Sequence, residues 1–454
     1  MHLNRVMIAA PKSGSGKTML VTALLELWRL MGKNVFAVKT GPDYIDPLFH
    51  ESVSGVPSFN LDTFFTDRMQ TLELLSKAAA DSEYGTCMME GVMGLYDGIG
   101  GVCQEGSSYE LAKWTKTPII LVIDAKGSAR TLLAVVKGML AMDEGHLIRG
   151  IILNRISENF FERIRTLIQE ETGISVVGFL PERKELSIES RYLGLKLPRE
   201  TDGIRERIRK AAEAICKTLN LDLLIRIAEK TEDITIVSDL RQAVKQKYRI
   251  AIAKDEAFCF YYRENLRLLS ELGCKFVFFS PIHDKELPEN INGMLLGGGY
   301  PELFAEKLSE NESMKRAVKD AIDDNMPVIA ECGGFLYLHE WLSDQNAREY
   351  SMCGVVQGRA YYGKRMNHFG YVSLEMQREE GNTFRGLKGH EFHRYDSTNP
   401  GRDLLAIKPY DGACYRTGHL QHAQYMGFVH MYLPSLPLFA KGFCKEVAHY
   451  AHTG

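Results

Sequence analysis

The hydrophobic residues of this chain come in short runs, which alternate with segments whose apolar residues recur at helical spacing. Such runs, bounded by glycine or polar turns, are typical of buried strands, and the segments between them predict amphipathic helices. Strands that alternate with helices favour parallel pairing. We therefore predict an α/β domain with a parallel sheet, opened by a strand, a glycine-rich turn and a helix that ends near residue 31. The first runs cover residues 6–10, 34–39, 87–90, 118–124, 150–154 and 175–180.

A second series of the same kind follows a long charged stretch. Its apolar runs cover 248–253, 275–279, 293–296 and 327–330, with a predicted helix at 264–272. The stretch before it is charged, yet five of its apolar residues recur at helical spacing: Ile204, Ile208, Ala211, Ile215 and Leu219. We predict a first domain over residues 1–190, a charged helical connection over 191–247, and a second α/β domain over 248–454.

Composition agrees with a globular protein of two domains. At 454 residues, with 45% hydrophobic and 25% charged residues, the chain is longer than one hydrophobic core usually organises. The formal net charge of -3 argues against a nucleic-acid or membrane-surface partner. The sequence has 9 cysteines and no C-x-x-C pair, which favours reduced thiols and hence the cytoplasm. No apolar run approaches the ~18 residues that a membrane helix needs, and we expect no signal peptide.

The first glycine-rich turn, at residues 10–18, has the pattern of a phosphate-binding loop. It reads A-P-K-S-G-S-G-K-T and joins a predicted strand to a helix. In that context backbone N–H groups surround phosphates, Lys17 neutralises the outer phosphates and Thr18 binds Mg²⁺. A flexible turn that merely caps a helix is the weaker alternative. We therefore predict ATP and Mg²⁺ as ligands, with further loop contacts from Gly14, Ser15 and Gly16.

Two positions of this loop set it apart from the usual pattern. Pro11 stands where G-x-x-x-x-G-K-[ST] has its first glycine. Lys12 occupies the place of the signature lysine of deviant Walker A ATPases, which this loop resembles. That resemblance implies a second phosphate contact, often made across a dimer. Lys12 is therefore our basis for expecting a homodimer.

Acidic residues follow the second and third predicted strands, at the edge of the sheet that should carry the phosphate loop. Ligands of an open parallel sheet collect outside the carboxyl ends of its strands. Because Mg²⁺ held by phosphates and a threonine still needs one or two carboxylates, we choose Asp43 and Glu90 as its ligands. Lys39 ends the second strand, at the same edge of the sheet. Asp46 and Asp97 are candidates for Mg²⁺ or substrate contacts, although turn or helix-cap roles stay open for both.

The segments around these residues resemble the cobyrinate a,c-diamide synthases, of the dethiobiotin-synthetase-like branch of P-loop enzymes. The similar motifs are K-T-G-P-D-Y-I-D-P-L-F-H at 39–50, N-L-D-T-F-F at 60–65, E-G-V-M-G-L-Y-D-G at 90–98, I-L-N-R at 152–155 and S-R-Y-L-G-L at 190–195. Tyr192 departs from the family, which often has histidine there.

This resemblance implies a role for each matching residue. Lys17, Thr18, Lys39 and Glu90 would serve ATP and the metal. A second group would face a carboxylate of the tetrapyrrole substrate, namely Asp43, Tyr44, Asp46 and Asp97. Residues 1–190 would then be the ATP-dependent synthetase domain.

The second domain carries a cysteine between a predicted strand and a predicted helix, at residues 327–336. Such an elbow exposes the thiol of Cys332, and we expect the helix N-terminus to lower its pKa. Upstream, the loop Gly297–Gly299 closes another strand. Its N–H groups are expected to form an oxyanion hole with that of Gly333, so Gly298, Gly299 and Gly333 are the candidates.

His430, at the end of a later apolar run, is our candidate for the base that serves Cys332. A buried histidine on a strand is more often only hydrogen-bonded, but a cysteine elbow and a glycine loop make catalysis the better interpretation. Class I glutaminases typically place an acid two residues after this histidine, where this chain has Tyr432. The glutaminase domains of the family look like Cys-His dyads. His390 and His393 do not have the spacing of the zinc-binding motif H-E-x-x-H, so we expect structural or substrate-facing roles for both.

These parts predict an ATP- and glutamine-dependent amidotransferase. Residues 248–454 would hydrolyse L-glutamine, and the P-loop domain would activate the a and c acetate carboxylates of a cobalamin-pathway tetrapyrrole as acyl phosphates. The nickel-sirohydrochlorin a,c-diamide synthases of coenzyme F430 biosynthesis resemble this chain equally well. A regulatory ATPase similar to MinD or ParA is the alternative from another class.

Overall fold

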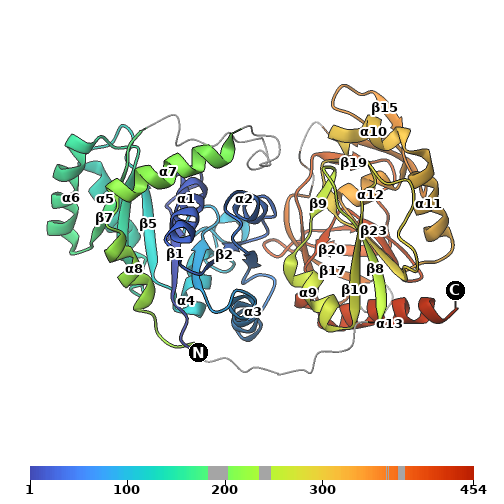
Figure 1. The fold of residues 1–454 in the computed structure, drawn as a ribbon, viewed down its shortest axis with the longest axis horizontal. Coiled ribbons are helices and arrows are strands. Elements are labelled where there is room, and N and C mark those ends of the chain that lie inside the picture. The colour runs from blue at the N-terminus through green and yellow to red at the C-terminus, as the bar shows by residue number, and fades with distance from the viewer. Residues whose placement is uncertain (183–202, 235–246, 364–365, 367, 377–383, 454) are drawn as a thin grey trace. The chain divides into compact units, whose positions relative to one another are not determined.

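The computed structural model describes residues 1–182, 203–234, 247–363, 366, 368–376 and 384–453. Its chain divides into two compact units, Met1–Asp239 and Leu240–Gly454 (Figure 1). The motif at 190–195, with Tyr192, lies outside the described residues.

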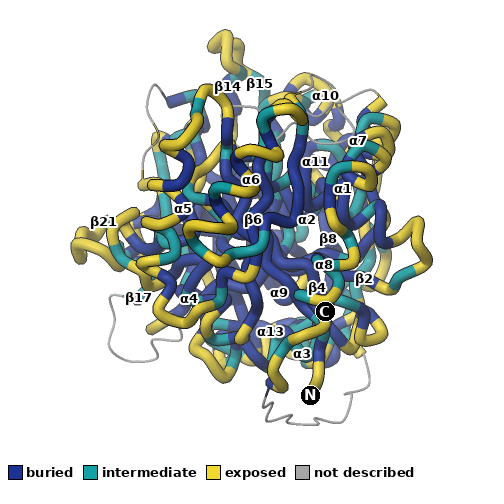
Figure 2. The backbone as a smooth tube through the Cα atoms, turned by 90° about the vertical axis from the view of Figure 1, so that its left-hand side faces the viewer, coloured by how far each residue is buried: buried dark blue, intermediate teal, exposed yellow. Residues whose placement is uncertain are grey.

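The first unit is built on a seven-stranded sheet in the order β3-β2-β4-β1-β5-β6-β7, and all its pairings are parallel. Parallel sheets need apolar cover on both faces, and the strands of this sheet are almost wholly buried (Figure 2). This confirms the predicted fold class. The strands are β1 (Arg5–Ala9), β2 (Val35–Thr40), β3 (Ser58–Leu61), β4 (Thr86–Glu90), β5 (Ile119–Asp124), β6 (Ile148–Asn154) and β7 (Val176–Leu180).

Helices cover the two faces of this sheet in two separate core clusters. One cluster joins α1, α2, α7 and α8 to one face, and the other joins α3, α4, α5 and α6 to the opposite face. The helices are α1 (Lys17–Leu30), α2 (Ile45–Ser54), α3 (Arg68–Asp81), α4 (Ser108–Thr115), α5 (Thr131–Ala141), α6 (Glu158–Thr172), α7 (Ile204–Thr218) and α8 (Leu221–Glu229).

Helix α7 lies in the charged range 191–247 and packs on the first unit. Its apolar stripe is buried against α1, and Leu219 forms a bridge with Gly178 of β7. Charged residues occupy the opposite side of the helix, as amphipathic packing requires. The described helices of this range therefore contribute to the core of the first unit.

The second unit has a six-stranded sheet in the order β10-β8-β11-β13-β23-β22, parallel except for β22. Three smaller sheets surround it, in the orders β12-β9, β15-β14-β16-β19 and β21-β20-β17-β18-β24. The strands of the main sheet are β8 (Tyr248–Ala253), β10 (Cys274–Phe279), β11 (Gly293–Leu296), β13 (Val328–Glu331), β22 (His419–Gln421) and β23 (Gln424–Gly427).

The remaining elements of this unit are short. The strands of the smaller sheets are β9 (Phe258–Phe260), β12 (Gly298–Gly299), β14 (His339–Ser343), β15 (Glu349–Ser351), β16 (Val356–Tyr362), β17 (Gly370–Met376), β18 (Leu387–Glu391), β19 (Tyr395–Ser397), β20 (Leu404–Ile407), β21 (Cys414–Thr417) and β24 (His430–Met431). The helices are α9 (Arg263–Glu271), α10 (Ala305–Glu310), α11 (Glu312–Asp323), α12 (Gly333–Tyr337) and α13 (Pro437–Thr453).

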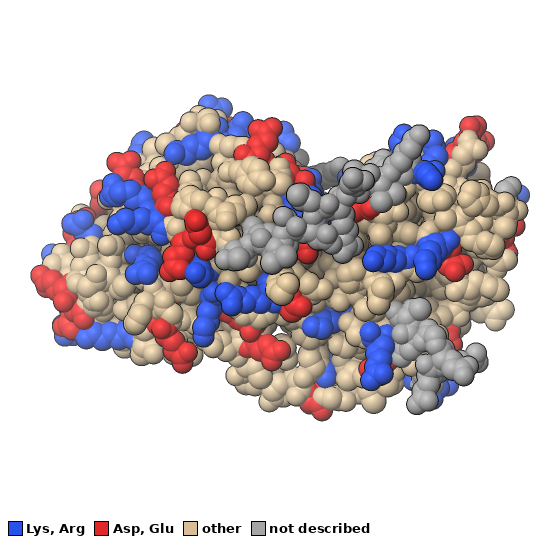
Figure 3. Space-filling view, turned by 90° about the horizontal axis from the view of Figure 1, so that it is seen from below, with Lys and Arg blue, Asp and Glu red and all other residues tan. Residues whose placement is uncertain are grey.

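Three further features concern membrane-spanning helices, cysteines and surface charge. Within the described ranges, we find no helix with the length and apolar character needed to traverse a bilayer. All nine cysteines lie in described segments and carry free thiols. On the face drawn in Figure 3, basic and acidic side chains are interspersed.

Candidate active sites

The phosphate loop follows β1 and leads directly into α1. Gly14 and Gly16 have left-handed backbone conformations, with φ of 73° and 92°. A Cβ at Gly16 would lie 2.4 Å from the side-chain nitrogen of Asn154, which donates to the carbonyl of Ser15 at 2.8 Å. Glycine is therefore required where the loop packs against β6, and the first N–H groups of α1 remain at the loop's open end.

Lys17 is 7% exposed and its ammonium group is held by backbone carbonyls. It donates to the carbonyl oxygen of Met93 at 2.6 Å and to that of Lys12 at 3.4 Å. Burial, reinforced by the nearby Lys39 ammonium, lowers the pKa of Lys17 to about 8. A buried cation with backbone partners alone is suited to an anionic ligand.

The depressed pKa of Lys17 predicts that nucleotide affinity depends on pH. Without ligand, Lys17 loses its proton as the pH rises through about 8, below the ordinary value of 10.5. Bound phosphates stabilise the ammonium form, so binding takes up a proton in this window. The dissociation constant for ATP should then rise by about tenfold per pH unit. Calorimetry at several pH values, in buffers of different ionisation enthalpy, measures both effects.

Arginine at position 17 provides the control for this pH dependence, because a guanidinium keeps its charge throughout. The dissociation constant of Lys17→Arg, whatever its size, should stay level across the same range. A level curve for the unmodified chain would contradict the role given to the Lys17 charge.

A buried polar cluster lies beside the loop, where β2 and β4 end. Lys39 and Glu90 are register partners on these parallel strands, and Lys39 Nζ donates to Glu90 Oε1 at 2.9 Å. Lys39 Nζ also donates to Asp46 Oδ2 at 2.5 Å. Thr18 Oγ1 donates to Glu90 Oε1 at 2.6 Å and lies 3.3 Å from Asp46 Oδ2. The structure thus brings Thr18, Lys39, Asp46 and Glu90 together.

The charges of this cluster determine its protonation. Burial alone would lower the pKa of Lys39, but Asp46, Glu90 and Asp43 outweigh it and raise that pKa. Burial likewise opposes ionisation of Glu90, yet Lys39 and His50 hold its pKa well below the usual value. Burial and the neighbouring Asp43 raise the pKa of Asp46. One lysine therefore faces more carboxylate charge than it can balance, which favours an additional cation.

His50 was not assigned a role from the sequence, although it ends the motif at 39–50. It is fully buried on α2, with Nε2 at 2.8 Å from Glu90 Oε2 and Nδ1 at 2.9 Å from Thr22 Oγ1. Thr22 Oγ1 donates in turn to the carbonyl of Thr18 at 2.7 Å. His50 therefore fixes the orientation of Glu90. Its spacing of one helical turn from Asp46 is the signal that would have pointed to it.

The other predicted acids have local partners. Asp43 Oδ1 accepts from the N–H groups of Ile45 and Asp46, at 2.9 and 3.1 Å, and so caps α2, while its Oδ2 lies 3.8 Å from Lys39 Nζ. Asp97 accepts from the N–H of Gly94 at 2.9 Å. Tyr44 is 7% exposed and stands directly before α2. Asp46, one turn further along α2, is the acid that contacts Thr18 and Lys39 most closely.

Lys12 differs from the other lysines of this site because it is open to solvent. Its side chain is 69% exposed, and Nζ lies 3.8 Å from Asp124 Oδ2 at the end of β5. Arg155 Nε donates to the same carboxylate at 2.8 Å. The exposed ammonium group is free to reach a ligand outside the loop.

In the second unit, the predicted elbow is present. Strand β13 is buried and ends at Glu331, Cys332 has φ 45° and ψ −101°, and α12 starts at the next residue. The N–H of Cys332 donates to the carbonyl of Gly427 at 2.8 Å. A residue other than glycine in this conformation is strained by about 1–3 kcal/mol, and such strain is typical of active sites.

The expected effect of the elbow on the Cys332 thiol was wrong. Cys332 is 8% exposed, and burial raises its pKa above the ordinary range. The carboxylates of Glu302 and Glu391 raise it further, while the N–H of Gly333 acts in the opposite direction. Helix α12 has only five residues, so its dipole does not offset the burial. The thiol therefore needs a base.

The loop Gly297–Gly299 lies against α12, the helix that follows Cys332, and against His430. A Cβ at Gly333 would be 2.9 Å from the nitrogen of Gly299, and a Cβ at Gly298 would be 2.4 Å from Cε1 of His430. The N–H of Gly334 donates to the carbonyl of Gly297 at 2.9 Å. The candidate oxyanion hole, elbow and base thus meet in one place.

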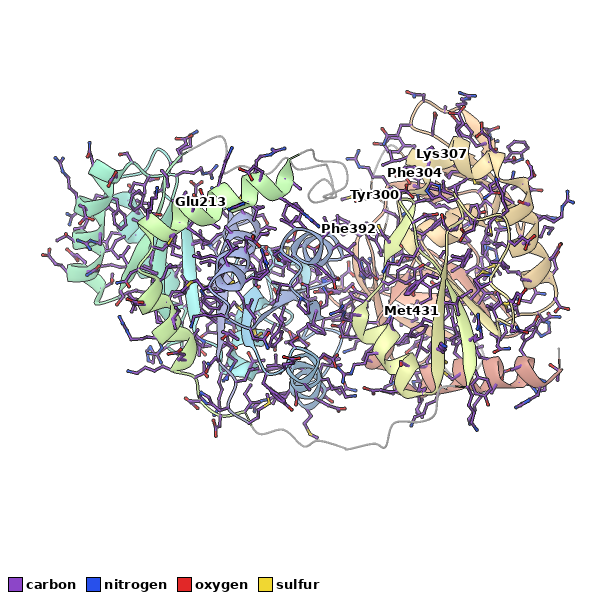
Figure 4. The ribbon with its side chains drawn as sticks, in the orientation of Figure 1. Glu213, Tyr300, Phe304, Lys307, Phe392 and Met431 are labelled. Carbon is purple, nitrogen blue, oxygen red and sulfur yellow. The ribbon has the colours of Figure 1, made fainter. Side chains whose placement is uncertain are left out.

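His430 belongs to β24, beside Met431, which Figure 4 labels. In the pairing of β18 with β24, His390 is its register partner, and the two rings stack with centroids 5.0 Å apart. Tyr262 OH lies 3.2 Å from His390 Nδ1. Burial, followed by the neighbouring His430, lowers the pKa of His390 well below its usual value. His390 is therefore a neutral ring that supports His430 from one side.

Glu391 and His393 form a second buried pair nearby. His393 Nε2 lies 2.9 Å from Glu391 Oε2, and Tyr415 OH donates to Glu391 Oε1 at 2.9 Å. The Nδ1 atom of His393 lies 2.6 Å from the carbonyl of Tyr395. Both buried side chains therefore have polar partners within the second unit.

Sequence comparisons agree with these two sites. Residues 6–193 match the CobQ/CobB/MinD/ParA nucleotide binding domain, and residues 249–431 match the CobB/CobQ-like glutamine amidotransferase domain. The chain is 37% identical to cobyrinate a,c-diamide synthase of Picrophilus torridus, over 98% of this chain and 99% of the relative. The corresponding enzyme of Clostridium acetobutylicum is also 37% identical, over 95% and 97%. That of Listeria innocua is 34% identical, over 96% and 97%.

The combination of a nucleotide-binding domain and a glutamine amidotransferase domain makes this chain a glutamine-hydrolysing ligase that uses ATP. The predicted resemblance is confirmed at nearly full length. The chain belongs to the cobyrinate a,c-diamide synthase family.

Proposed function

We propose that this enzyme converts the a and c acetate side chains of cobyrinate to amides, with ATP as the activating reagent and glutamine as the nitrogen source. The observation that carries the proposal is the presence of two built sites in one chain, the loop with Lys17 and Glu90 and the elbow with Cys332 and His430. The names of the relatives support the choice of macrocycle.

At the glutaminase site, the thiol proton of Cys332 passes to His430 and Sγ attacks the side-chain amide carbon of glutamine. N–H groups of Gly299 and Gly333 stabilise the oxyanion, with Gly298 shaping the loop. The C–N bond breaks as His430 returns the proton to the leaving ammonia. Water then hydrolyses the thioester and releases glutamate.

At the P-loop site, ATP phosphorylates the acetate carboxylate, because a bare carboxylate is a poor electrophile. Ammonia attacks the resulting acyl phosphate and phosphate leaves. Lys17 and Lys39 neutralise the transferred group, and the loop from Gly14 to Gly16 binds the phosphates. The resemblance implies that Asp43, Tyr44, Asp46 and Asp97 face the substrate. We keep this role for Asp43, Tyr44 and Asp97, because Asp46 contacts Thr18 and Lys39.

The acidic cluster fits Mg²⁺, because its donors are the oxygens of Thr18, Asp46 and Glu90 and its carboxylates exceed the charge of Lys39. Within the described ranges, no group of three or more acidic, histidine or cysteine side chains is arranged to hold a metal ion by itself. A magnesium ion that also binds phosphates needs only one or two carboxylates, so Thr18 and Glu90 suffice, with Asp43 or Asp46 beside them. Bound there, Mg²⁺ would neutralise phosphate charge.

Two further features belong to this proposal. Exposed Lys12 is suited to contact a phosphate from the neighbouring copy in a homodimer. Free thiols fit a reducing compartment, and we place the enzyme in the cytoplasm.

A panel of macrocycles tests the substrate. The enzyme is incubated with ATP, Mg²⁺, glutamine and either cobyrinate or nickel-sirohydrochlorin, and the products are analysed by mass spectrometry. We expect a diamide from cobyrinate. Conversion of nickel-sirohydrochlorin alone would instead assign the chain to coenzyme F430 biosynthesis. ATP hydrolysis without any amidation or glutamate release would favour a regulatory ATPase.

A further inference from the structure

We infer that Glu331 is the positioning residue of His430, so that the strand carrying the nucleophile also supplies the acid of a catalytic triad. The inference rests on the proposed roles of Cys332 and His430. It gives the site a third member that the sequence did not reveal, since Tyr432 stands where such an acid usually lies.

The geometry of Glu331 is that of a buried carboxylate aimed at the base. Its Oε2 lies 3.7 Å from His430 Nδ1, and the two side chains are 10% and 4% exposed. Its Oε1 accepts the N–H of Met431 at 3.0 Å, which fixes the carboxylate beside β24. At this burial, the charge acts on the imidazole with little screening by water.

The sheet explains how a residue next to the nucleophile reaches the base. Strand β13 pairs in parallel with β23, with Glu331 opposite Gly427, and His430 follows only a few residues later. At Cys332 the chain turns away from the strand with φ 45°. Glu331 and Cys332 can therefore approach the same imidazole from different directions.

Tyr432, at the position that usually holds the acid, makes aromatic contacts in this structure. Tyr432 packs edge-on against Tyr262, with ring centroids 5.1 Å apart, and Tyr262 also contacts His390. His390 stacks on the His430 ring and stays neutral because burial lowers its pKa. Glu331 provides a negative charge on another side of this imidazole, 3.7 Å from Nδ1.

The distance of 3.7 Å is longer than a hydrogen bond, and it is expected to shorten once glutamine is bound. A hydrogen bond from Nδ1–H to Glu331 selects the tautomer whose unprotonated Nε2 accepts the thiol proton of Cys332. The carboxylate then stabilises the imidazolium that forms. Its contribution is therefore made during thioester formation, rather than in glutamine binding.

The variant Glu331→Gln tests this role, because glutamine keeps an oxygen for the Met431 N–H and removes only the charge. We expect kcat for glutamate release to fall by about 10- to 1000-fold with KM nearly unchanged. Amidation driven by ammonium chloride should keep its rate, which shows that the chain is folded. Glu312→Gln, which removes an exposed carboxylate from α11, is the matched control and should match the unmodified enzyme.

A double-mutant cycle separates positioning from a structural role. If Glu331 acts through His430, then Glu331→Gln should cost nothing further in a His430→Asn background. Equal losses in both backgrounds would overturn the inference. So would the loss of ammonia-driven amidation in both Glu331→Gln and the charge-keeping Glu331→Asp, because it would mark a structural role.

Failure of the underlying proposal gives a different result. If Cys332→Ala or His430→Asn still released glutamate at the normal rate, the proposed site itself would be wrong. If both lost this activity while Glu331→Gln kept its full kcat, only the role of Glu331 would be wrong.

Discussion

Replacing Cys332 by alanine is expected to lower glutamine-dependent amidation by at least about 10⁴-fold, because no thioester can form. Ammonium chloride should restore amidation, since the P-loop site receives ammonia whatever its source. Cys332 lies at the strained elbow beside the glycine loop, and alanine retains the packing of its Cβ. Steady-state rates with glutamine and with ammonium chloride measure the two activities.

The exposed Cys414 on β21 provides the control for this experiment. Cys414→Ala should keep both activities. Full glutamine-dependent activity in Cys332→Ala would contradict the assignment of the nucleophile. Loss of the ammonia-dependent activity as well would mean that the variant acts on the fold and not on thioester chemistry.

Replacing Lys17 by alanine should abolish amidation with both nitrogen sources and leave the glutaminase site intact. Amidation with either nitrogen source is expected to fall by about 10³-fold or more, because the transferred phosphoryl group loses its main buried cation. Lys17 is 7% exposed and held at the loop by the carbonyl of Met93. The glutaminase site lies in the other unit and should still accept glutamine.

Lys113, exposed on α4 of the same unit, is the matched control, and Lys113→Ala should retain full amidation. ATP binding by calorimetry should weaken in Lys17→Ala alone. Ammonia-driven amidation at the normal rate in Lys17→Ala would show that this loop is not where the carboxylate is activated.

The main sheets were predictable because their strands are buried apolar runs with helices between them. The first strand, the loop and α1 follow one another as the pattern indicates, and α1 ends at Leu30. Strand β3 was missed because its alternation of polar and apolar residues, S-F-N-L, is only four residues long. Most of the strands between His339 and Gln421 were missed because they are also short, at three to five residues each.

The apolar stripe of α7 was visible in the sequence, but its partner was not. Ile204, Ile208 and Ile215 predict one buried face, and only the tertiary structure shows that this face packs on α1. The charged composition of this range comes from the solvent-facing side of the helix, which carries nearly all of its charge.

At the P-loop site, parallel register made the meeting of Lys39 and Glu90 predictable, since both end neighbouring strands. The choice between Asp43 and Asp46 was not predictable, because it depends on how the first turn of α2 is capped. Glu331 was missed because neighbouring strand residues normally point to opposite faces. The elbow at Cys332 breaks that rule.

The central claim is that one polypeptide couples glutamine hydrolysis to ATP-dependent amidation. The most direct test uses [amide-¹⁵N]glutamine. Mass spectrometry measures the transfer of ¹⁵N to the macrocycle, and the release of ADP and glutamate is measured in the same reaction. We predict labelled amides, with one ADP and one glutamate formed for each. Labelled amides formed without ADP, or glutamine hydrolysis whose nitrogen never enters the macrocycle, would contradict the account.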